Sequence, residues 1–261
     1  MLNFKGTVVS ALFVGAAMTA QVALAGHDDN SIKAKITGFE YSDVVDVKIS
    51  SNSGKKWTTV EAGAYKGTWE NGDAFAAFCV EISQGLAPLG KWASYTEGTF
   101  SSSVENSLTS LANKYYSFVD DAVTSAAFQV AVWEIVTESK TGLNLDKGSF
   151  QADNTTDTTK EWVPSRFLPF VGSWKYTTID NPESLAAVTL AQTWLSGIND
   201  DSVLATGDYS LQYLKNGKYQ DLVVFTQIAA VPEPATYGML LLGMGVMALV
   251  ARRRRANTIR F

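Results

Sequence analysis

Two residues of this chain, Cys79 and Gln129, have types and surroundings that favour covalent chemistry. Cys79 is the only cysteine among the 261 residues, so no disulfide can form within the chain. Gln129 follows 50 positions later in a segment that is apolar on nearly every side, where an unpaired amide costs on the order of 1–3 kcal/mol. A thiol held against a carboxamide in a water-poor pocket can attack the carbonyl carbon, expel ammonia and leave a thioester.

Both residues also have simpler explanations, which the sequence leaves open. A free cysteine is commonly a small buried hydrophobic residue, and a buried glutamine can bond with the backbone of a neighbouring strand. A thiol that is accessible before any treatment would favour these explanations over a thioester.

Two buried elements are expected to position the pair. Cys79 lies in residues 73–82, an apolar stretch that predicts a strand with both faces largely buried. Gln129 lies in residues 121–138, which predict a helix packed inside the domain because apolar residues surround it. These apolar positions recur at helical spacing, with Phe128, Val132 and Ile135 on one face and Ala126, Val130 and Trp133 on another.

The two segments resemble the Cys-Gln thioester domains of bacterial surface adhesins. In that family an aromatic-Cys-apolar-acid/amide segment supplies the sulfur, as Phe78-Cys79-Val80-Glu81 would here. An apolar-Gln-x-Ala-apolar-Trp helix supplies the acyl group, as Phe128-Gln129-Val130-Ala131-Val132-Trp133 would here. The resemblance implies supporting roles for Phe78, Glu81 and Trp133, although Trp133 is also explained as a simple core residue.

This resemblance also implies a mode of action. A surface amine or hydroxyl would attack the Gln129 carbonyl, release Cys79 as a thiolate and leave the protein covalently bound to its target. The acyl group is used once per molecule, so we expect no turnover enzyme and no cofactor. Such domains are best known on Gram-positive cells.

The C-terminal end has the order of a sorting signal. Val231-Pro232-Glu233-Pro234 precedes an apolar run over residues 235–251, which is close to the roughly 20 residues of a membrane-spanning helix. The four arginines Arg252, Arg253, Arg254 and Arg255 follow and would hold that end in the cytoplasm. The block resembles the PEP-CTERM tail of Gram-negative surface proteins, which the membrane protease exosortase recognises. The alternative is an ordinary membrane anchor that stays uncut.

The N-terminal end resembles a signal peptide. Lys5 precedes an apolar run over residues 8–17, and a signal-peptidase site fits between Ala25 and Gly26. We therefore expect a signal peptide at 1–25, an extracellular domain at 26–228 and a sorting tail at 229–261. Signal peptidase and exosortase would be processing partners, the inner membrane would hold the tail transiently, and the destination would be the cell surface, outer membrane or extracellular matrix.

Charge and residue counts exclude several functions. Six of the 21 basic residues lie outside residues 26–234, whereas all 26 acidic ones lie inside, which gives that segment a formal charge of −11. Nucleic-acid binding therefore loses its electrostatic driving force. Single His and Cys residues exclude metal sites that need several such ligands, so none is predicted.

A hydrolytic function is also disfavoured. His27, the only histidine, lies at the predicted mature N-terminus, which argues against Cys-His proteolysis. Glu134 and Glu138 lie one helical turn apart, but nothing indicates the cleft and opposing environments of a glycosidase. We expect these two carboxylates to form a solvated face.

The remaining pattern predicts an α+β domain, with a β-rich sandwich or barrel and an inserted subdomain of about three helices. Strands are expected around residues 32–36, 45–49, 57–59, 65–69 and 73–82, with a closing hairpin over 209–228. Helices are expected from a capping box at Ser102 to about 118, over 121–138, and from Asn181 to about 198. Residues 142–172 lack periodicity and predict a long exposed loop.

The sequence thus predicts an exported adhesin-like protein that attaches covalently to an amine- or hydroxyl-bearing surface protein or polysaccharide. The main alternative is a matrix protein that associates with exopolysaccharide without covalent chemistry and keeps Cys79 as a buried free thiol. A secreted hydrolase is the third class, and it lacks a convincing general base.

Overall fold

The computed structural model describes residues 31–138, 142–164, 172–200 and 202–228, together with residues 244 and 247. The chain divides into two compact units, Ala25–Ile228 and a second that combines Met1–Leu24 with Ala229–Phe261. The strands and the helices α1 to α3 lie in the first unit. The predicted signal peptide, its cleavage site at Ala25 and Gly26, and the sorting residues from Val231 to Arg255 lie outside the described residues, apart from positions 244 and 247.

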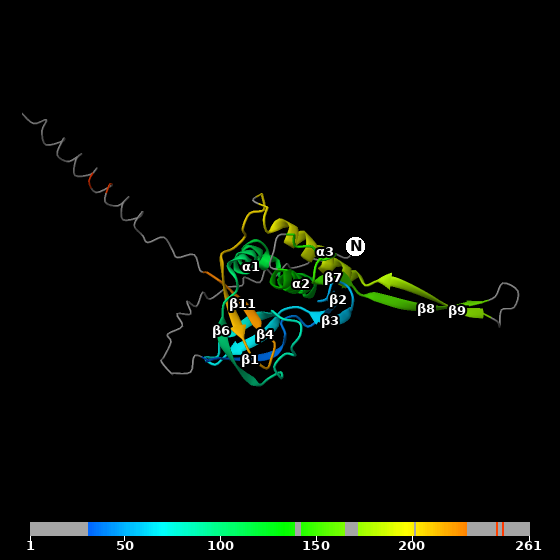
Figure 1. The fold of residues 1–261 in the computed structure, drawn as a ribbon, viewed down its shortest axis with the longest axis horizontal. Coiled ribbons are helices and arrows are strands. Elements are labelled where there is room, and N and C mark those ends of the chain that lie inside the picture. The colour runs from blue at the N-terminus through cyan, green and yellow to red at the C-terminus, as the bar shows by residue number, and fades with distance from the viewer. Residues whose placement is uncertain are drawn as a thin grey trace, which may run out of the picture. The chain divides into compact units, whose positions relative to one another are not determined.

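The elements follow one another in a β, α, β order (Figure 1). The first strands are β1 (Ser31–Phe39), β2 (Val45–Ser50), β3 (Thr58–Ala62), β4 (Tyr65–Trp69), β5 (Ala74–Cys79) and β6 (Trp92–Gly98). Helix α1 (Ser102–Tyr115), the 3-10 turn η1 (Tyr116–Phe118) and helix α2 (Ala122–Glu138) come next. Strands β7 (Gln151–Asn154), β8 (Thr156–Pro164) and β9 (Gly172–Asp180), helix α3 (Pro182–Gly197), and strands β10 (Tyr209–Lys215) and β11 (Leu222–Gln227) complete the unit.

Six of these strands close into a barrel in the order β1-β4-β5-β11-β10-β6. Strands β3, β2 and β7 form a separate small sheet, and β8 pairs with β9 as a two-stranded ribbon. All of these pairings are antiparallel. The predicted α+β class, with a barrel-like β portion and about three inserted helices, is confirmed.

Helix α2 is the centre of the core. It is buried without interruption from Ser125 to Ile135, because α1, α3 and β5 pack around it (Figure 1). Phe78 of β5 meets Phe128 of α2 with ring centroids 4.8 Å apart, and Phe225 of β11 lies 6.2 Å from Phe78. A helix that is apolar on all sides is stable only where it is covered on all sides, as the sequence pattern predicted.

Of the two predicted helix caps, the one at α3 is confirmed and the one at α1 is wrong. Asn181 caps α3 as predicted, because its side chain accepts a hydrogen bond from the Ser184 backbone N–H at 3.0 Å and Pro182 occupies the first turn. The predicted capping box at Ser102 is not formed. Ser101 is the N-cap of α1, and its side chain makes no capping hydrogen bond.

The prediction of one long loop over residues 142–172 was wrong, because this stretch contains β7, β8 and the start of β9. Every residue of β8 is exposed, so this strand has no buried face to produce an alternating hydrophobic pattern. Threonine and aromatic residues still favour extended backbone, which was the available signal. Strand β6 was also missed, although Ala93 and Tyr95 alternate there with exposed residues.

The Phe78 contacts give a first prediction. Phe78→Ala should lower the free energy of unfolding by about 3–5 kcal/mol, because a fully buried ring is lost between the barrel and α2. Phe118→Ala is the matched control, since 52% of Phe118 is exposed, and should change stability by no more than about 0.5 kcal/mol. Chemical denaturation measures both. Equal losses in the two variants would contradict this account of the core.

Candidate functional site

Cys79 is the last residue of β5, at a point where its backbone faces an open strand edge. The next residue, Val80, donates its N–H to the Asp221 carbonyl beside β11 at 2.9 Å. In a strand, the N–H and C=O of one residue point to one side, and those of the next residue point to the opposite side. Because Val80 points towards β11, the N–H and C=O of Cys79 point away from β11, towards β4. The pairing of β4 with β5 stops at Tyr65 and Ala77, which leaves Cys79 without a strand partner there.

The carboxamide of Gln129 occupies this open edge. The Cys79 N–H donates to Gln129 Oε1 at 2.8 Å, and Gln129 Nε2 donates to the Cys79 carbonyl oxygen at 2.8 Å. The side-chain amide therefore takes the position of the missing strand residue and satisfies both backbone groups. Gln129 is 1% exposed and Cys79 is 2% exposed, so the whole arrangement is closed to water.

Helix α2 presents a second polar side chain to the same edge. Ser125 lies one helical turn before Gln129 and is also buried. Its Oγ accepts a hydrogen bond from the Ala64 N–H, immediately before β4, at 2.8 Å. Ser125 was not identified from the sequence, because a serine in an apolar helix carries no signal of the backbone group that it meets.

These contacts bring the two predicted reactive residues together. The amide of Gln129 is hydrogen-bonded to strand backbone, which is the arrangement that the simpler explanation requires, and Cys79 is a free, buried thiol. The same contacts also have a chemical consequence. An N–H that donates to a carbonyl oxygen stabilises negative charge there when the carbonyl carbon is attacked.

Burial controls the reactivity of the thiol. It raises the pKa of Cys79 well above its ordinary value, so the sulfur is protonated at neutral pH. Phe78 faces the helices, and therefore Cys79, the next residue along β5, faces the interior of the barrel. Tyr65 and Tyr95 are close enough to Cys79 to interact with it electrostatically, and neither was identified from the sequence.

The other predicted support residues lie in different surroundings. Phe78 packs against Phe128 on the helix-facing side of β5. Trp133 is buried beside Phe150, with ring centroids 6.4 Å apart, and its indole N–H has no hydrogen-bond partner among the described residues. Glu81 is partly exposed and accepts a hydrogen bond from Ser83 Oγ at 3.3 Å.

The expected solvated face of Glu134 and Glu138 was wrong. Glu134 is fully buried, and its Oε1 accepts a hydrogen bond from the Asn144 N–H at 2.7 Å. Glu138 accepts bonds from the N–H groups of Ser149 and Phe150. The two carboxylates thus fold residues 142–150 back over the end of α2, which sequence spacing cannot reveal because the donors are backbone groups of a nonperiodic segment.

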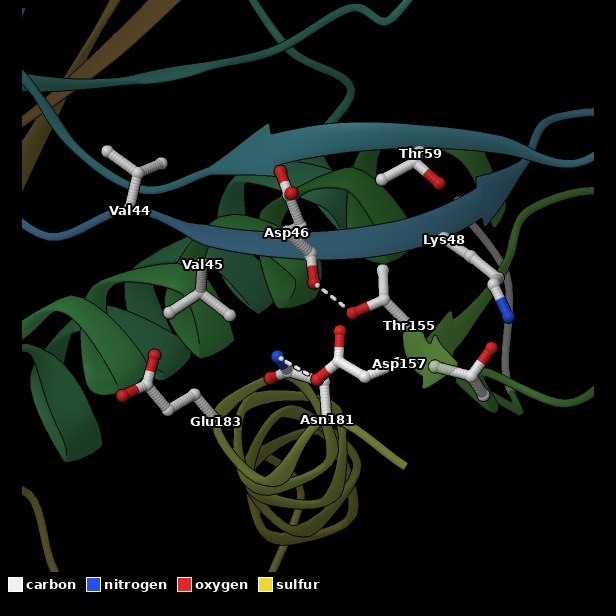
Figure 2. Close-up of a pocket in the computed structure, with 10 residues that line it drawn as sticks. Val44, Val45, Asp46, Lys48, Thr59, Thr155, Asp157, Asn181 and Glu183 are labelled. Atoms are coloured by element: carbon white, nitrogen blue, oxygen red, sulfur yellow. Dashed lines mark hydrogen bonds between the residues drawn. The ribbon is translucent and has the colours of Figure 1, made fainter. Parts of the chain in front are cut away.

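A polar cleft of about 310 Å³ lies elsewhere on the unit (Figure 2). Figure 2 shows Asp157 facing Asn181 and Thr155 facing Asp46. Asn181 Nδ2 donates a hydrogen bond to Asp157 Oδ2 at 3.3 Å, and Thr155 Oγ1 donates one to the Asp46 carbonyl oxygen at 3.4 Å. Neither Cys79 nor Gln129 lines this cleft. Within the described part of the chain, no group of three or more acidic, His or Cys residues is placed to hold a metal ion.

Comparison with known proteins identifies the tail. Residues 230–255 match the PEP-CTERM protein-sorting motif. This motif marks an exported surface protein that is anchored in the membrane and then processed, and it implies processing by exosortase. Among the residues that the structure describes, no helix combines the length and apolarity needed to cross a bilayer. The predicted spanning run over 235–251 lies outside them, except for positions 244 and 247.

The N-terminal thioester domain of fibronectin-binding protein SfbI from Streptococcus pyogenes is similar to this chain, with a TM-score of 0.37 and 14% sequence identity. The similarity covers 73% of this chain and 98% of that one. No curated protein matches the chain.

The role of Gln129 in sealing the strand edge gives a stability prediction. In a Cys79→Ala background, where no thioester can form, Gln129→Ala should lower the free energy of unfolding by roughly 2–5 kcal/mol, because two buried backbone groups lose their partner. Gln192→Ala is the control, since Gln192 accepts one bond from the Leu145 N–H at a partly buried position. Its cost should be about 1 kcal/mol. A smaller effect at Gln129 than at Gln192 would rule out this structural role.

Glu134 gives a pH prediction. Its pKa is raised from 4.5 to about 7, mainly because burial disfavours the charged carboxylate. The hydrogen bond from Asn144 lowers the pKa, and the nearby charge of Glu138 raises it. The folded state therefore binds more protons than the unfolded state between these two values, and stability falls as pH rises from about 4.5 to about 7. The slope contributed by this group is at most about 1.4 kcal/mol per pH unit.

Chemical denaturation at several pH values between about 4.5 and 7 tests whether the free energy of unfolding falls as pH rises. Glu134→Gln should remove this component of the slope, because the amide cannot ionise. Glu105→Gln, at an exposed position in α1, should leave it in place. A slope that survives Glu134→Gln unchanged would show that another group is responsible.

Proposed function

We propose that this exported surface protein forms an internal thioester between Cys79 and Gln129 and uses it for covalent attachment to a surface nucleophile. The observation that carries the proposal is the pair of 2.8 Å hydrogen bonds between the Gln129 carboxamide and the backbone of Cys79. They hold the acyl group beside the residue that bears the thiol. Fixed geometry of this kind raises the effective concentration of the reacting groups.

Formation of the bond balances without a cofactor. The Cys79 sulfur attacks Cδ of Gln129, the C–N bond breaks, and the amide nitrogen leaves as ammonia with the proton of the thiol. The Cys79 N–H already donates to Gln129 Oε1, where negative charge develops in the tetrahedral intermediate. The proton must travel with the nitrogen, because burial disfavours a free thiolate.

Use of the bond is a single acyl transfer rather than turnover catalysis. A lysine amine or a hydroxyl attacks the same carbon, the C–S bond breaks, and the target is joined to Gln129 by an amide or an ester. Exclusion of water protects the thioester until the nucleophile arrives. The nearly complete burial of both residues means that the target reaches the carbon only after local opening of the α2–β5 contact.

The tail determines where this chemistry would take place. Signal peptidase would release the chain at Gly26, and exosortase would act on the segment that contains Pro232, Glu233 and Pro234. The processed domain would then reach the cell surface, the outer membrane or the extracellular matrix. A protein or polysaccharide that bears amines or hydroxyls in a biofilm is the target class that fits this destination.

One observation favours a second function, non-covalent association with exopolysaccharide. The β8–β9 ribbon carries Trp162, Trp174 and Tyr176, residues that are 42%, 49% and 62% exposed. Exposed aromatic rings on an extracellular ribbon suit the apolar faces of sugars, and the hydroxyls of neighbouring threonines suit their polar edges. In that function Cys79 remains a thiol, and Gln129 serves only to close the edge of β5.

Intact-mass measurement separates the two functions. The purified full chain should have a mass about 17 Da below that of its Gln129→Ala and Cys79→Ala variants after correction for the substitutions, because ammonia is lost only when both residues are present. Methylamine should then add to the wild type alone and leave a thiol that can be alkylated.

The opposite result is equally clear. A wild-type chain at full mass, with a thiol that alkylates only after denaturation, would refute the thioester. The exposed ribbon would then be the surface to examine, by measuring whether Trp174→Ala weakens retention on exopolysaccharide.

A further inference from the structure

The interior of the barrel places a tyrosine hydroxyl opposite Cys79. In the strand order β1-β4-β5-β11-β10-β6, two strands separate β5 from β6 in either direction, so Cys79 and Tyr95 project from opposite walls. Tyr95 pairs with Ile32 of β1 and is 0% exposed. Cys79 pairs with Leu222 of β11, which is also 0% exposed. Both side chains therefore occupy the closed interior.

The hydroxyl of Tyr95 has no hydrogen-bond partner among the described residues. A buried hydroxyl without a partner costs about 1–3 kcal/mol, and phenylalanine would fill the same space without that cost. An isolated buried polar group of this kind needs an explanation. Burial, followed by the proximity of Cys79, raises the pKa of Tyr95 to about 12, so the phenol keeps its proton and is available as a donor.

The other ionisable groups around Tyr95 are less suitable donors. Asp221 also raises the pKa of Tyr95. Its carboxylate already accepts hydrogen bonds from the Tyr213 hydroxyl and the Asn216 N–H, each at 2.7 Å. Tyr219 is the remaining group that raises the pKa of Tyr95, and it is partly exposed in the segment before β11. Tyr65 lies near Cys79 but is partly exposed and stacks on Phe39, with ring centroids 4.4 Å apart. Tyr95 is the fully buried donor in this group.

We propose that the Tyr95 hydroxyl protonates the sulfur of Cys79 when a nucleophile opens the thioester. This inference rests on the proposed function, and it assigns to the same site the group that controls its reactivity. It explains why a hydroxyl without a hydrogen-bond partner among the described residues is kept inside the barrel.

With an amine as the nucleophile, atoms and charges balance within the site. The amine nitrogen attacks Cδ of Gln129, the C–S bond breaks and its electron pair passes to sulfur. Tyr95 gives its proton to that sulfur, and the proton lost by the amine returns to the tyrosine oxygen. The products are an amide at Gln129, a neutral Cys79 thiol and a restored phenol. Without a donor, the departing thiolate would remain charged in a low-dielectric interior, which is unfavourable.

Tyr95→Phe tests the step because it removes the hydroxyl alone. The full chain of the wild type and the variant should both show the loss of about 17 Da, and methylamine should open the variant more slowly, on the order of 10²-fold. Tyr116→Phe is the matched control. Tyr116 is a partly buried tyrosine that packs against Phe78 on the helix-facing side of β5, so the thioester of its variant should open at the wild-type rate.

A second readout separates proton transfer from packing. Opening of the wild type should be slower in D₂O than in H₂O because a proton moves in the rate-limiting step, and Tyr95→Phe should lose most of this isotope effect. The wild-type isotope effect remains informative even if the variant fails to fold, since its absence alone would overturn the inference.

The outcomes also distinguish this inference from the proposed function. A wild type at full mass overturns the thioester and this step together. A wild type that lacks about 17 Da, with Tyr95→Phe opening at the wild-type rate, leaves the thioester in place and overturns only the role of Tyr95.

Discussion

The structure depends on how one strand edge of the barrel is closed. Strand β4 begins at Tyr65, too late to pair with the end of β5, and the backbone of Cys79 would be left unpaired inside the core. The Gln129 carboxamide bonds with both the N–H and the C=O of Cys79 and completes that edge. Ser125, one helical turn earlier in α2, accepts a hydrogen bond from the Ala64 N–H. Unpaired buried backbone groups are costly, so these two side chains fix both the depth and the rotation of α2 against the barrel. The rest of the helical layer follows from that position.

A helix held so deeply must be covered on every side. Helices α1 and α3 pack beside α2, and residues 142–150 fold over its end through backbone bonds to Glu134, Glu138 and Gln192. The same burial has two opposite effects on the chemistry of Cys79. It would keep water away from the proposed thioester, but it also raises the pKa of the thiol and makes a free thiolate unfavourable. Proton donors and acceptors within the closed interior therefore decide how reactive the site can be.

The sorting motif and the domain answer different questions about the protein. The motif at residues 230–255 accounts for export, anchoring and processing, but carries no information about what the exported domain does. That activity must be sought in the domain, where a single cysteine leaves no internal disulfide and stability depends on the packed core. The paired Cys79 and Gln129 and the aromatic β8–β9 ribbon are the two features of that domain that point beyond packing.

The sequence by itself determined the elements whose signals are local. Periodicity around Phe128 predicted a buried α2, and Asn181 and Pro182 predicted the start of α3. Alternation along β1 and β2 and the hairpin signal over residues 209–228 predicted strands, because these patterns depend on neighbours in the chain. The pairing of Cys79 with Gln129 was suggested by residue type and by resemblance, and the structure placed the two in contact. Tertiary structure alone decided the register of β5, the burial of Glu134, and the position of Tyr95 across the barrel. Each of these depends on a partner distant in the sequence, and strands β8 and β9, exposed on both faces, lack the buried side that would have revealed them.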